Sequence, residues 1–364
     1  MSEETAQQLT DTDAAILSWE TWDRVKHTER FAIVAAVVFV ALWSWLFARA
    51  PITSELGGYH SLATTILIWS VFAIGFNLLL GQTGLLSFGH AMFWGGGGYA
   101  AALVSLHVYG DPVLMLVVGT TFTLLLAALT GVIALRLHAV YFAIITLAMG
   151  QLLYYLATSP LRPITGGRNG LTGIQLEPIF GLVYLGMPLP GIFGTLWVNY
   201  EYLLVATVFV LVIAFVNRIR KSPYGLIFRA IRENEQRVSF VGLNVWRYKF
   251  AAFLMSGGIV GLGGSLMTIE SQFAGLGSLY WITSGEVVIM TVLGGVGTLF
   301  GPVLGAVIFL YFEGVVDGFP IVGRYWLLML ATVFTAIVWK YPDGLWGMLK
   351  LIASRIRSSV EDNP

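Results

Sequence analysis

The chain has 364 residues, of which 57% are hydrophobic and only 11% are charged, and its formal net charge is zero. A soluble domain carries about 25% charged residues, so this composition excludes a soluble globular protein and predicts an all-α polytopic membrane protein. The zero net charge argues against a nucleic-acid partner, and the absence of cysteine excludes disulfides and thiol or Cys-zinc chemistry.

Residues 1–30 precede the first apolar segment and are predicted to form a cytoplasmic tail. They lack the apolar core of a cleavable signal peptide. Apolar residues do recur there at helical spacing: Ala15, Ile16, Trp19, Trp22 and Val25. This spacing favours a short helix lying at the membrane interface, and a tail without regular structure explains the segment equally well.

Nine apolar stretches follow, and most have the length of one transmembrane helix. The eight simple ones are 31–49, 62–80, 85–106, 112–135, 139–158, 201–217, 248–270 and 325–340. The ninth, 285–313, has 29 residues and contains several helix breakers: Gly294, Gly295, Gly297, Gly301 and Pro302. A single straight helix is not expected for it.

Lysine and arginine concentrate in three segments, which marks these segments as cytoplasmic. The segments are the N-terminal tail, residues 218–249 and the chain from 340 onward. An even number of crossings must separate each pair, so 285–313 is predicted to enter and leave the membrane as two segments that meet near GGVGTLFGP. About ten spans result, within a range of nine to eleven, with both termini cytoplasmic and 16 of the 20 Lys and Arg residues inside.

This topology divides the chain into a transmembrane domain at 31–345 and a cytoplasmic basic tail at 346–364. The longest external segment is 159–200. Within it, the mildly apolar stretch 181–197 is predicted to be a re-entrant or surface helix, and an eleventh span is the alternative.

Residues 80–103, LGQTGLLSFGHAMFWGGGGYAAAL, combine glycines with one histidine in an apolar stretch. Gly95, Gly96, Gly97 and Gly98 allow either close helix packing or a break that exposes backbone groups. His90 is either a structural ring bonded to a neighbouring helix or a pathway residue. Glu286, at the start of a predicted span, either stays hydrated near the external interface or lies where substrate enters.

Two segments resemble each other: LGQTGLLSFG at 80–89 and LGGVGTLFG at 293–301. Both lie where two apolar segments meet with almost no loop. Corresponding interruptions in two halves indicate a transport pathway built from internal repeats, and chance similarity of glycine-rich sequences is the alternative.

The basic segment 218–247 contains an amphipathic pattern, and one helix is predicted for 222–244. Ser222 followed by Pro223 is a helix start, and Gly242 is a helix end. Four apolar residues share one face: Ile227, Ile231, Val238 and Val241. Arg229 with Glu233, and Glu233 with Arg237, form i,i+4 pairs on the other face. The helix either lies on anionic lipid headgroups or docks another protein.

Several blocks of the sequence, in order, resemble those of the inner-membrane permeases of branched-chain amino acid ABC transporters, in particular their M-type subunits. The blocks are FNLLLGQTGLLSFGHAMFWGGGGYAAAL (76–103), YFAIITLAMGQLL (141–153), TGGRNGLTG (165–173), RAIRENEQRVSFVGLNVWRYKFAAF (229–253) and WITSGEVVIMTVLGGVGTLFGPVLGA (281–306). Residues 1–60 and the tail after about 345 carry no such similarity.

The resemblance implies a prokaryotic inner-membrane permease subunit of an ATP-driven importer. Its implied partners are a homologous second permease, two ATP-binding subunits and an external substrate-binding protein. The loop that couples to the ATPases would contain Arg229, Arg232, Glu233, Asn234, Glu235 and Gly242. The ten-span count is also similar to the fold of vitamin B12-type importers.

The chain has no phosphate-binding loop, because no lysine follows a glycine. No ATPase site, other catalytic residue or cofactor is therefore predicted in it. ATP and Mg²⁺ would be bound by partner subunits. The histidines are scattered, so no metal site is predicted. A urea or short-amide importer is the alternative. A secondary transporter would place ionisable groups at mid-membrane, and a membrane enzyme would need a catalytic cluster.

Overall fold

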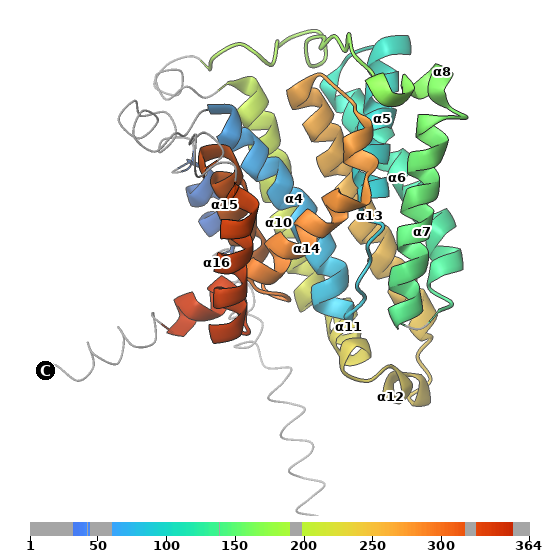
Figure 1. The fold of residues 1–364 in the computed structure, drawn as a ribbon, viewed down its shortest axis with the longest axis vertical. Helices are drawn as coiled ribbons and strands as arrows, with labels where there is room; N and C mark the ends of the chain where they lie inside the picture. Colours follow the sequence, from blue (N-terminus) through green and yellow to red (C-terminus); the bar gives the residue numbers. More distant parts are fainter. Residues whose placement is uncertain are drawn as a thin grey trace, which may run out of the picture.

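The computed structural model describes residues 32–41, 43, 60–137, 139–189, 199–316 and 325–351, and the regular elements in these residues are helices (Figure 1). The predicted tail 1–30 lies outside the described residues, as do residues 352–364 of the predicted C-terminal tail. The all-α fold class predicted from composition is therefore confirmed for the described chain.

Each predicted apolar segment contains a helix. The helices are Ala32–Ala41, α4 (His60–Thr83), α5 (Ala91–His107), α6 (Pro112–Ala134), α7 (Ala139–Thr158), α10 (Tyr200–Lys221), α13 (Val245–Ser271), α14 (Trp281–Gly294), α15 (Gly301–Tyr311) and α16 (Trp326–Lys340). Five of those described are long and apolar enough to cross a membrane: α4, α6, α7, α10 and α13. The others are shorter, so ten complete crossings remain a prediction.

The stretch 285–313 is split as predicted. Helix α14 ends at Gly294, a turn covers 295–300, and α15 begins at Gly301 and packs against α14. A helix of 14 residues such as α14 is about 21 Å long, which is less than the roughly 30 Å of hydrocarbon in a bilayer. The connection at 84–90 is different, because these seven residues leave the helix and α5 begins only at Ala91, not at the predicted 85.

Helix α13 is the centre of the bundle and packs along α4, α5 and α6 (Figure 1). Its buried face consists largely of small residues, including Ser256, Gly257, Gly261, Gly264 and Ser265. Small side chains let helix backbones approach closely, which is how helices associate where lipid removes the hydrophobic driving force. The hydrophobic core therefore surrounds a seam of glycine and serine.

Residues 159–189 cover one end of the bundle, where they contain α8 (Arg162–Thr165) and η1 (Gly167–Asn169) (Figure 1). Asp111 ties them down: one carboxylate oxygen accepts the amide of Val113 at 2.8 Å as the cap of α6, and the other accepts the amide of Phe180 at 2.7 Å. Residues 181–189 form turns and isolated bridges, so the helix predicted at 181–197 is wrong for this described half; 190–198 lie outside the described residues.

Candidate functional site

The basic loop forms two helices rather than the single helix predicted. Helix α11 covers Pro223–Glu233 and α12 covers Glu235–Phe240, with Asn234 extended between them. The side chain of Asn234 accepts the backbone amide of Arg237 at 3.0 Å and so caps α12. A capping asparagine offers the backbone an alternative to continuing the helix, which is why α11 ends there.

The local details of the loop are confirmed in part. Helix α11 begins at Pro223 as predicted, but the Ser222 hydroxyl donates to the carbonyl of Ile219 at 2.7 Å and does not cap the helix. Gly242 has φ +87°, which is the conformation expected where a helix ends.

The apolar face of the loop also differs from the prediction at one position. Ile231, Val238 and Val245 form a small buried cluster, and Ile227 packs against it. Val241 was predicted to share this face but is 80% exposed, because the chain has left α12 before it.

The two predicted ion pairs are absent from the described loop. The Arg229 Nε donates to the carbonyl of Gly225 at 3.2 Å, and Glu235 instead pairs with Lys249 of α13. Lys249 is nearly buried, so this pair fastens the start of α12 to α13. We call the end of the bundle that carries α11 and α12 the basic end; it lies opposite α8 (Figure 1).

Arg232 links the basic loop to the end of α4. Its guanidinium donates to the carbonyl of Gly81 at 2.6 Å, and its Cγ would lie 3.1 Å from a Cβ placed on Gly84. Charged hydrogen bonds of this kind are about twice as strong as neutral ones. Among the residues predicted for coupling, Arg232 is the one joined directly to the interrupted segment at 80–89.

The α14–α15 turn is attached to the same place. Asn77 of α4 donates to the carbonyl of Thr298 at 2.7 Å and accepts the amide of Gly297 at 2.8 Å. Arg220, near the end of α10, donates to the carbonyl of Gly297 at 2.8 Å. We call the set Asn77, Gly81, Arg220, Arg232 and Gly297 the junction. It connects α4, α10, α11 and the turn through one layer of hydrogen bonds.

The two similar sequences noted above therefore meet in space. A Cβ placed on Gly81 would lie 2.7 Å from the Cα of Gly297. Their backbones differ, however, because 84–90 is a non-helical stretch and 295–300 is a tight turn between packed helices. The sequence similarity thus marks two neighbouring helix ends, and a pathway built from internal repeats stays a prediction.

The outer surface of the loop contains a groove of about 440 Å³ at the break between α11 and α12. It is lined by Ala230, Glu233, Asn234, Arg237, Val238, Val241 and Leu243. Beside it Phe240 is 86% exposed. Exposed apolar side chains next to a groove indicate a surface that binds a partner. The predicted residues thus divide: Arg232 faces the membrane helices, and Glu233 and Asn234 face outward.

The four consecutive glycines lie inside one continuous helix, so the predicted alternative of a backbone break at 95–98 is wrong. A Cβ on Gly97 would fall on the carbonyl oxygen of Gly261, and one on Gly98 would lie 2.6 Å from the Thr268 hydroxyl. Gly95 and Gly96 are buried in the same helix and face Leu279 and Phe122. Glycine here permits close contact between α5 and α13.

His90 has no exposed surface and bonds a neighbouring helix. Its Nε2 lies 2.9 Å from the Ser256 hydroxyl, which itself donates to the carbonyl of Gly75 at 2.7 Å. Because the serine proton is used, the imidazole must be the donor to Ser256. Phenylalanine rings surround it, with Phe76 at 5.0 Å between centroids. In this conformation His90 is a structural ring that joins α4 and α13.

Glu286 lies in the second turn of α14 and is partly buried. Glu313 lies in the π-helical segment Phe312–Val316 that follows α15. Nothing in this arrangement identifies a substrate contact, so that role of Glu286 stays a prediction. The described residues contain no group of three or more His, Asp or Glu side chains placed to hold a metal ion.

A separate cavity of about 300 Å³, which the sequence did not predict, lies between α4, α5, α13 and the start of α14. Trp69 and Trp94 form one wall, with ring centroids 5.1 Å apart. Four hydroxyl side chains line the cavity as well: Thr268, Ser271, Ser278 and Thr283. The available signal was a pair of tryptophans, each away from the ends of its predicted apolar segment, 62–80 or 85–106.

The sequence is similar to those of known transport permeases. The family described as "branched-chain amino acid transport system / permease component" matches residues 58–338. The high-affinity branched-chain amino acid transport system permease protein LivM of Escherichia coli K12 is 28% identical over 340 residues, 88% of this chain and 76% of that protein. A probable LivM permease of Methanocaldococcus jannaschii is 22% identical over 78% of this chain and 93% of its own length. No solved structure matches, so the vitamin B12-type fold remains a prediction.

Proposed function

Because the chain belongs to the family of permease components of branched-chain amino acid transport systems, we propose that it forms the translocation pathway of an ATP-driven importer for leucine, isoleucine and valine. The observation that carries this proposal is the family match over 58–338, which includes α4, the junction, the basic loop and most of α16. The relatives named above are permeases of this transport class.

The tryptophan-lined cavity is the substrate station that we propose within this pathway. Its indole rings supply an apolar wall for an aliphatic side chain. Its hydroxyl oxygens can accept from an ammonium, and the Thr268 hydroxyl can donate to a carboxylate, whereas the other three hydroxyl protons already bond main-chain carbonyls. Urea or a short amide is the second candidate, since the hydroxyls also suit an amide. The two indole rings favour the branched-chain amino acid, because an amide offers them little apolar surface.

The basic end is the cytoplasmic side in this proposal, with both termini there, and its groove receives ATP-binding subunits. Two such subunits, a homologous second permease and an external binding protein would complete the complex. ATP and Mg²⁺ would be bound by those subunits, and this chain would contain no cofactor or catalytic residue. Support comes from the basic residues gathered at this end and from exposed Phe240 beside the groove.

The junction explains how such a complex would be coupled. A partner that moves α11 would pull on Arg232 and thereby on the carbonyl of Gly81 at the end of α4. Arg220 and Asn77 connect the same place to the α14–α15 turn. A displacement at the basic loop thus reaches two interrupted segments through hydrogen bonds, which can break and re-form without disturbing the packed core.

The first test measures uptake of leucine, and of urea in parallel, by liposomes that contain this chain with its ATPase subunits, second permease and binding protein. We expect ATP-dependent uptake of leucine. Uptake of urea alone would keep the importer and overturn the substrate. Uptake of either solute without ATPase subunits would overturn the importer and favour a secondary transporter.

Site variants make this test specific. Thr268→Val and Thr283→Val remove hydroxyls from the cavity, and we expect the KM for leucine to rise about tenfold, the effect of one or two hydrogen bonds. Thr207→Val is the matched control, because its exposed hydroxyl only bonds the carbonyl of Leu203 within α10. Arg232→Ala with Glu233→Ala should abolish uptake and release the ATPase subunits, while Arg218→Ala, exposed near the end of α10, should do neither.

A further inference from the structure

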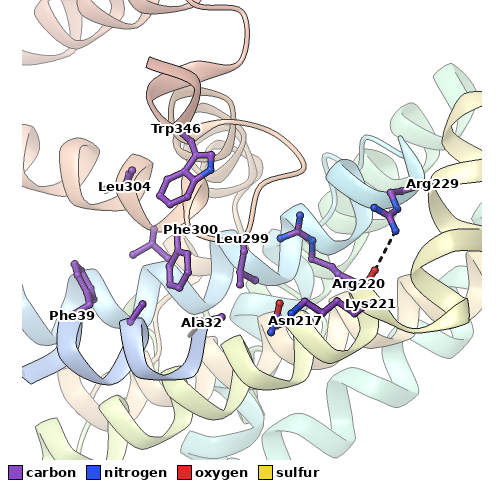
Figure 2. A pocket seen from close by; sticks show the side chains of 12 residues that line it. Ala32, Phe39, Asn217, Arg220, Lys221, Arg229, Leu299, Phe300, Leu304 and Trp346 are labelled. Atoms are coloured by element: carbon purple, nitrogen blue, oxygen red, sulfur yellow. Dashed lines mark hydrogen bonds between the residues drawn. The ribbon is translucent and has the colours of Figure 1, made fainter. Parts of the chain in front are cut away.

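A cavity of about 740 Å³ at the basic end has no role in the function proposed above. It lies between the helix Ala32–Ala41, the end of α10, helix α11 and the turn before α15 (Figure 2). Most of its wall is apolar: Ala32, Ala35, Phe39, Leu299, Phe300, Val303, Leu304 and Trp346. An apolar wall of this extent suits a ligand with a hydrocarbon part.

One end of the cavity is basic. Arg220, Lys221 and Arg229 lie together there, away from Phe39 and Trp346 (Figure 2). Acidic side chains are absent from the described residues that line it. Arg220 and Arg229 are close enough for their like charges to act on each other. Both donate to main-chain carbonyls, at 2.8 Å to Gly297 and 3.2 Å to Gly225, so carboxylates do not neutralise them within the described residues.

The apolar part of the cavity borders the outside of the bundle. The helix Ala32–Ala41 that walls it also exposes Val34, Val37 and Val38, which are surfaces for hydrocarbon in a membrane protein. A ligand that satisfies both ends must combine a hydrocarbon chain with an anionic group. Basic pockets between transmembrane helices bind anionic lipid headgroups for this reason.

We propose that this cavity binds an anionic phospholipid of the leaflet at the basic end, with its phosphate among Arg220, Lys221 and Arg229 and one acyl chain beside Phe39, Phe300 and Val303. The site reaches the junction, because Arg220 also holds the carbonyl of Gly297. The bound phosphate would neutralise the repulsion between Arg220 and Arg229. Lipid binding would thereby hold Arg220 beside the α14–α15 turn.

The test is native mass spectrometry of the complete complex, extracted in mild detergent and incubated with phosphatidylglycerol or, as a neutral reference, phosphatidylcholine. We expect phosphatidylglycerol to be retained preferentially. Arg229→Gln should lower its retention about fivefold, the factor expected for one cation beside an anionic headgroup. Ala35→Phe, which fills the apolar part, should lower it to a similar degree.

Two control variants match these changes. Arg218→Gln removes a charge near the end of α10, and Val37→Phe places the same phenyl ring at an outward-facing position of the same helix as Ala35; neither Arg218 nor Val37 lines the cavity. Both should retain phosphatidylglycerol as the wild type does. Equal losses in all four variants would overturn the site and indicate an unspecific surface effect.

A second measurement locates the acyl chain independently. Trp346 is one of 12 tryptophans and lies in the cavity wall, so the difference in fluorescence quenching between wild type and Trp346→Phe by bromine-labelled phosphatidylglycerol reports on this wall alone. A difference that Ala35→Phe abolishes supports the proposal. Equal quenching of wild type and Trp346→Phe would overturn it.

Other occupants are distinguished in the same assays. Glycerol phosphate that displaces the lipid completely would show that the site binds a free phosphate group and not a lipid. Retention of phosphatidylglycerol only after deletion of residues 1–28 would identify the acidic N-terminal segment as the occupant. Either result would overturn the proposal.

Discussion

The interior seam and the junction hold helices together in opposite ways. In the seam between α5 and α13, Gly97 lies directly against the carbonyl of Gly261, so contact is made by backbone atoms with no side chain between them. In the junction, long side chains such as Arg232 and Asn77 reach across to backbone carbonyls. The seam requires that side chains be absent at the contact, and the junction requires long polar side chains.

This difference separates the parts of the molecule that can change from those that cannot. A close-packed seam does not tolerate added volume, because an added side chain would overlap with the facing backbone. A hydrogen-bonded layer can exchange partners at little net cost, since each bond contributes only about 1 kcal/mol to stability. We therefore expect substitutions in the seam to act on folding and those in the junction to act on transport.

The largest expected effect is in the seam. Gly97→Val and Gly264→Val place a side chain onto a carbonyl oxygen of the opposite helix, that of Gly261 or of Trp94. Overpacking of this kind costs about 3 kcal/mol or more where backbone must move. Thermal unfolding of the detergent-solubilised protein measures it. Unfolding at the wild-type temperature would show that α5 and α13 are not tightly packed.

His90 connects the seam to α4 and should have the next largest effect. Ser256→Ala leaves the His90 imidazole and the Gly75 carbonyl without their partner. Buried groups left unpaired cost about 1 to 3 kcal/mol each. The same unfolding assay applies, and Ser271→Ala, an exposed hydroxyl at the end of the same helix, is the control. Equal stability of both variants would contradict the role assigned to His90.

Substitutions in the junction should reduce transport rather than the stability of the fold. Arg232→Ala removes the bond to Gly81, and since the side chain is exposed we expect the unfolding free energy to fall by about 1 kcal/mol at most. Leucine uptake should fall roughly tenfold, with the ATPase subunits still bound when Glu233 is intact. Arg232→Lys, which keeps the charge but reaches less far, should be intermediate. Unchanged uptake in Arg232→Ala would separate the junction from coupling.

Substitutions on the exposed surface of the basic loop should affect only the binding of the ATPase subunits. Phe240→Ser removes an apolar side chain that is 86% exposed, so the stability of the isolated permease should change by less than about 0.5 kcal/mol. Burying a phenylalanine in an interface contributes about 1.5 to 3 kcal/mol, so ATPase subunits should bind roughly tenfold to a hundredfold more weakly. Pull-down of labelled ATPase subunits measures this, and undiminished binding would place the contact elsewhere.

The smallest effect is expected at Gly285, which serves as the reference for glycine substitutions in the seam. Gly285 lies in α14 at helical φ, and a Cβ there would meet nothing within 4 Å. Gly285→Ala should stabilise the helix by up to about 1 kcal/mol, because alanine loses less conformational entropy than glycine. Comparison with Gly97→Val tests whether replacing any helical glycine lowers stability or only replacing a glycine of the seam. A loss of stability in Gly285→Ala would indicate a contact outside this chain.

The sequence predicted the features that follow from composition and local chemistry. Apolar runs gave the helical segments, the glycines and proline at 294–302 gave the split between α14 and α15, and Ser222-Pro223 gave the start of α11. It failed at Asn234, where a single side-chain bond to the amide of Arg237 ends one helix and starts another. It also failed for the ion pairs of Arg229, Glu233 and Arg237. Arg229 donates to the carbonyl of Gly225 instead, and the break at Asn234 puts Glu233 and Arg237 on different helices.

By itself, the sequence determined that this protein is a helical membrane protein, where its helices are interrupted and which loop is basic, because hydrophobicity, helix breaking and charge are local properties. Only the tertiary structure decided that Gly81 and Gly297 touch, that His90 bonds Ser256 and that Trp69 and Trp94 enclose a cavity. The residues of such a pair are far apart along the chain. They meet because of steric fit and hydrogen-bond geometry between packed helices, and no rule of sequence spacing encodes these.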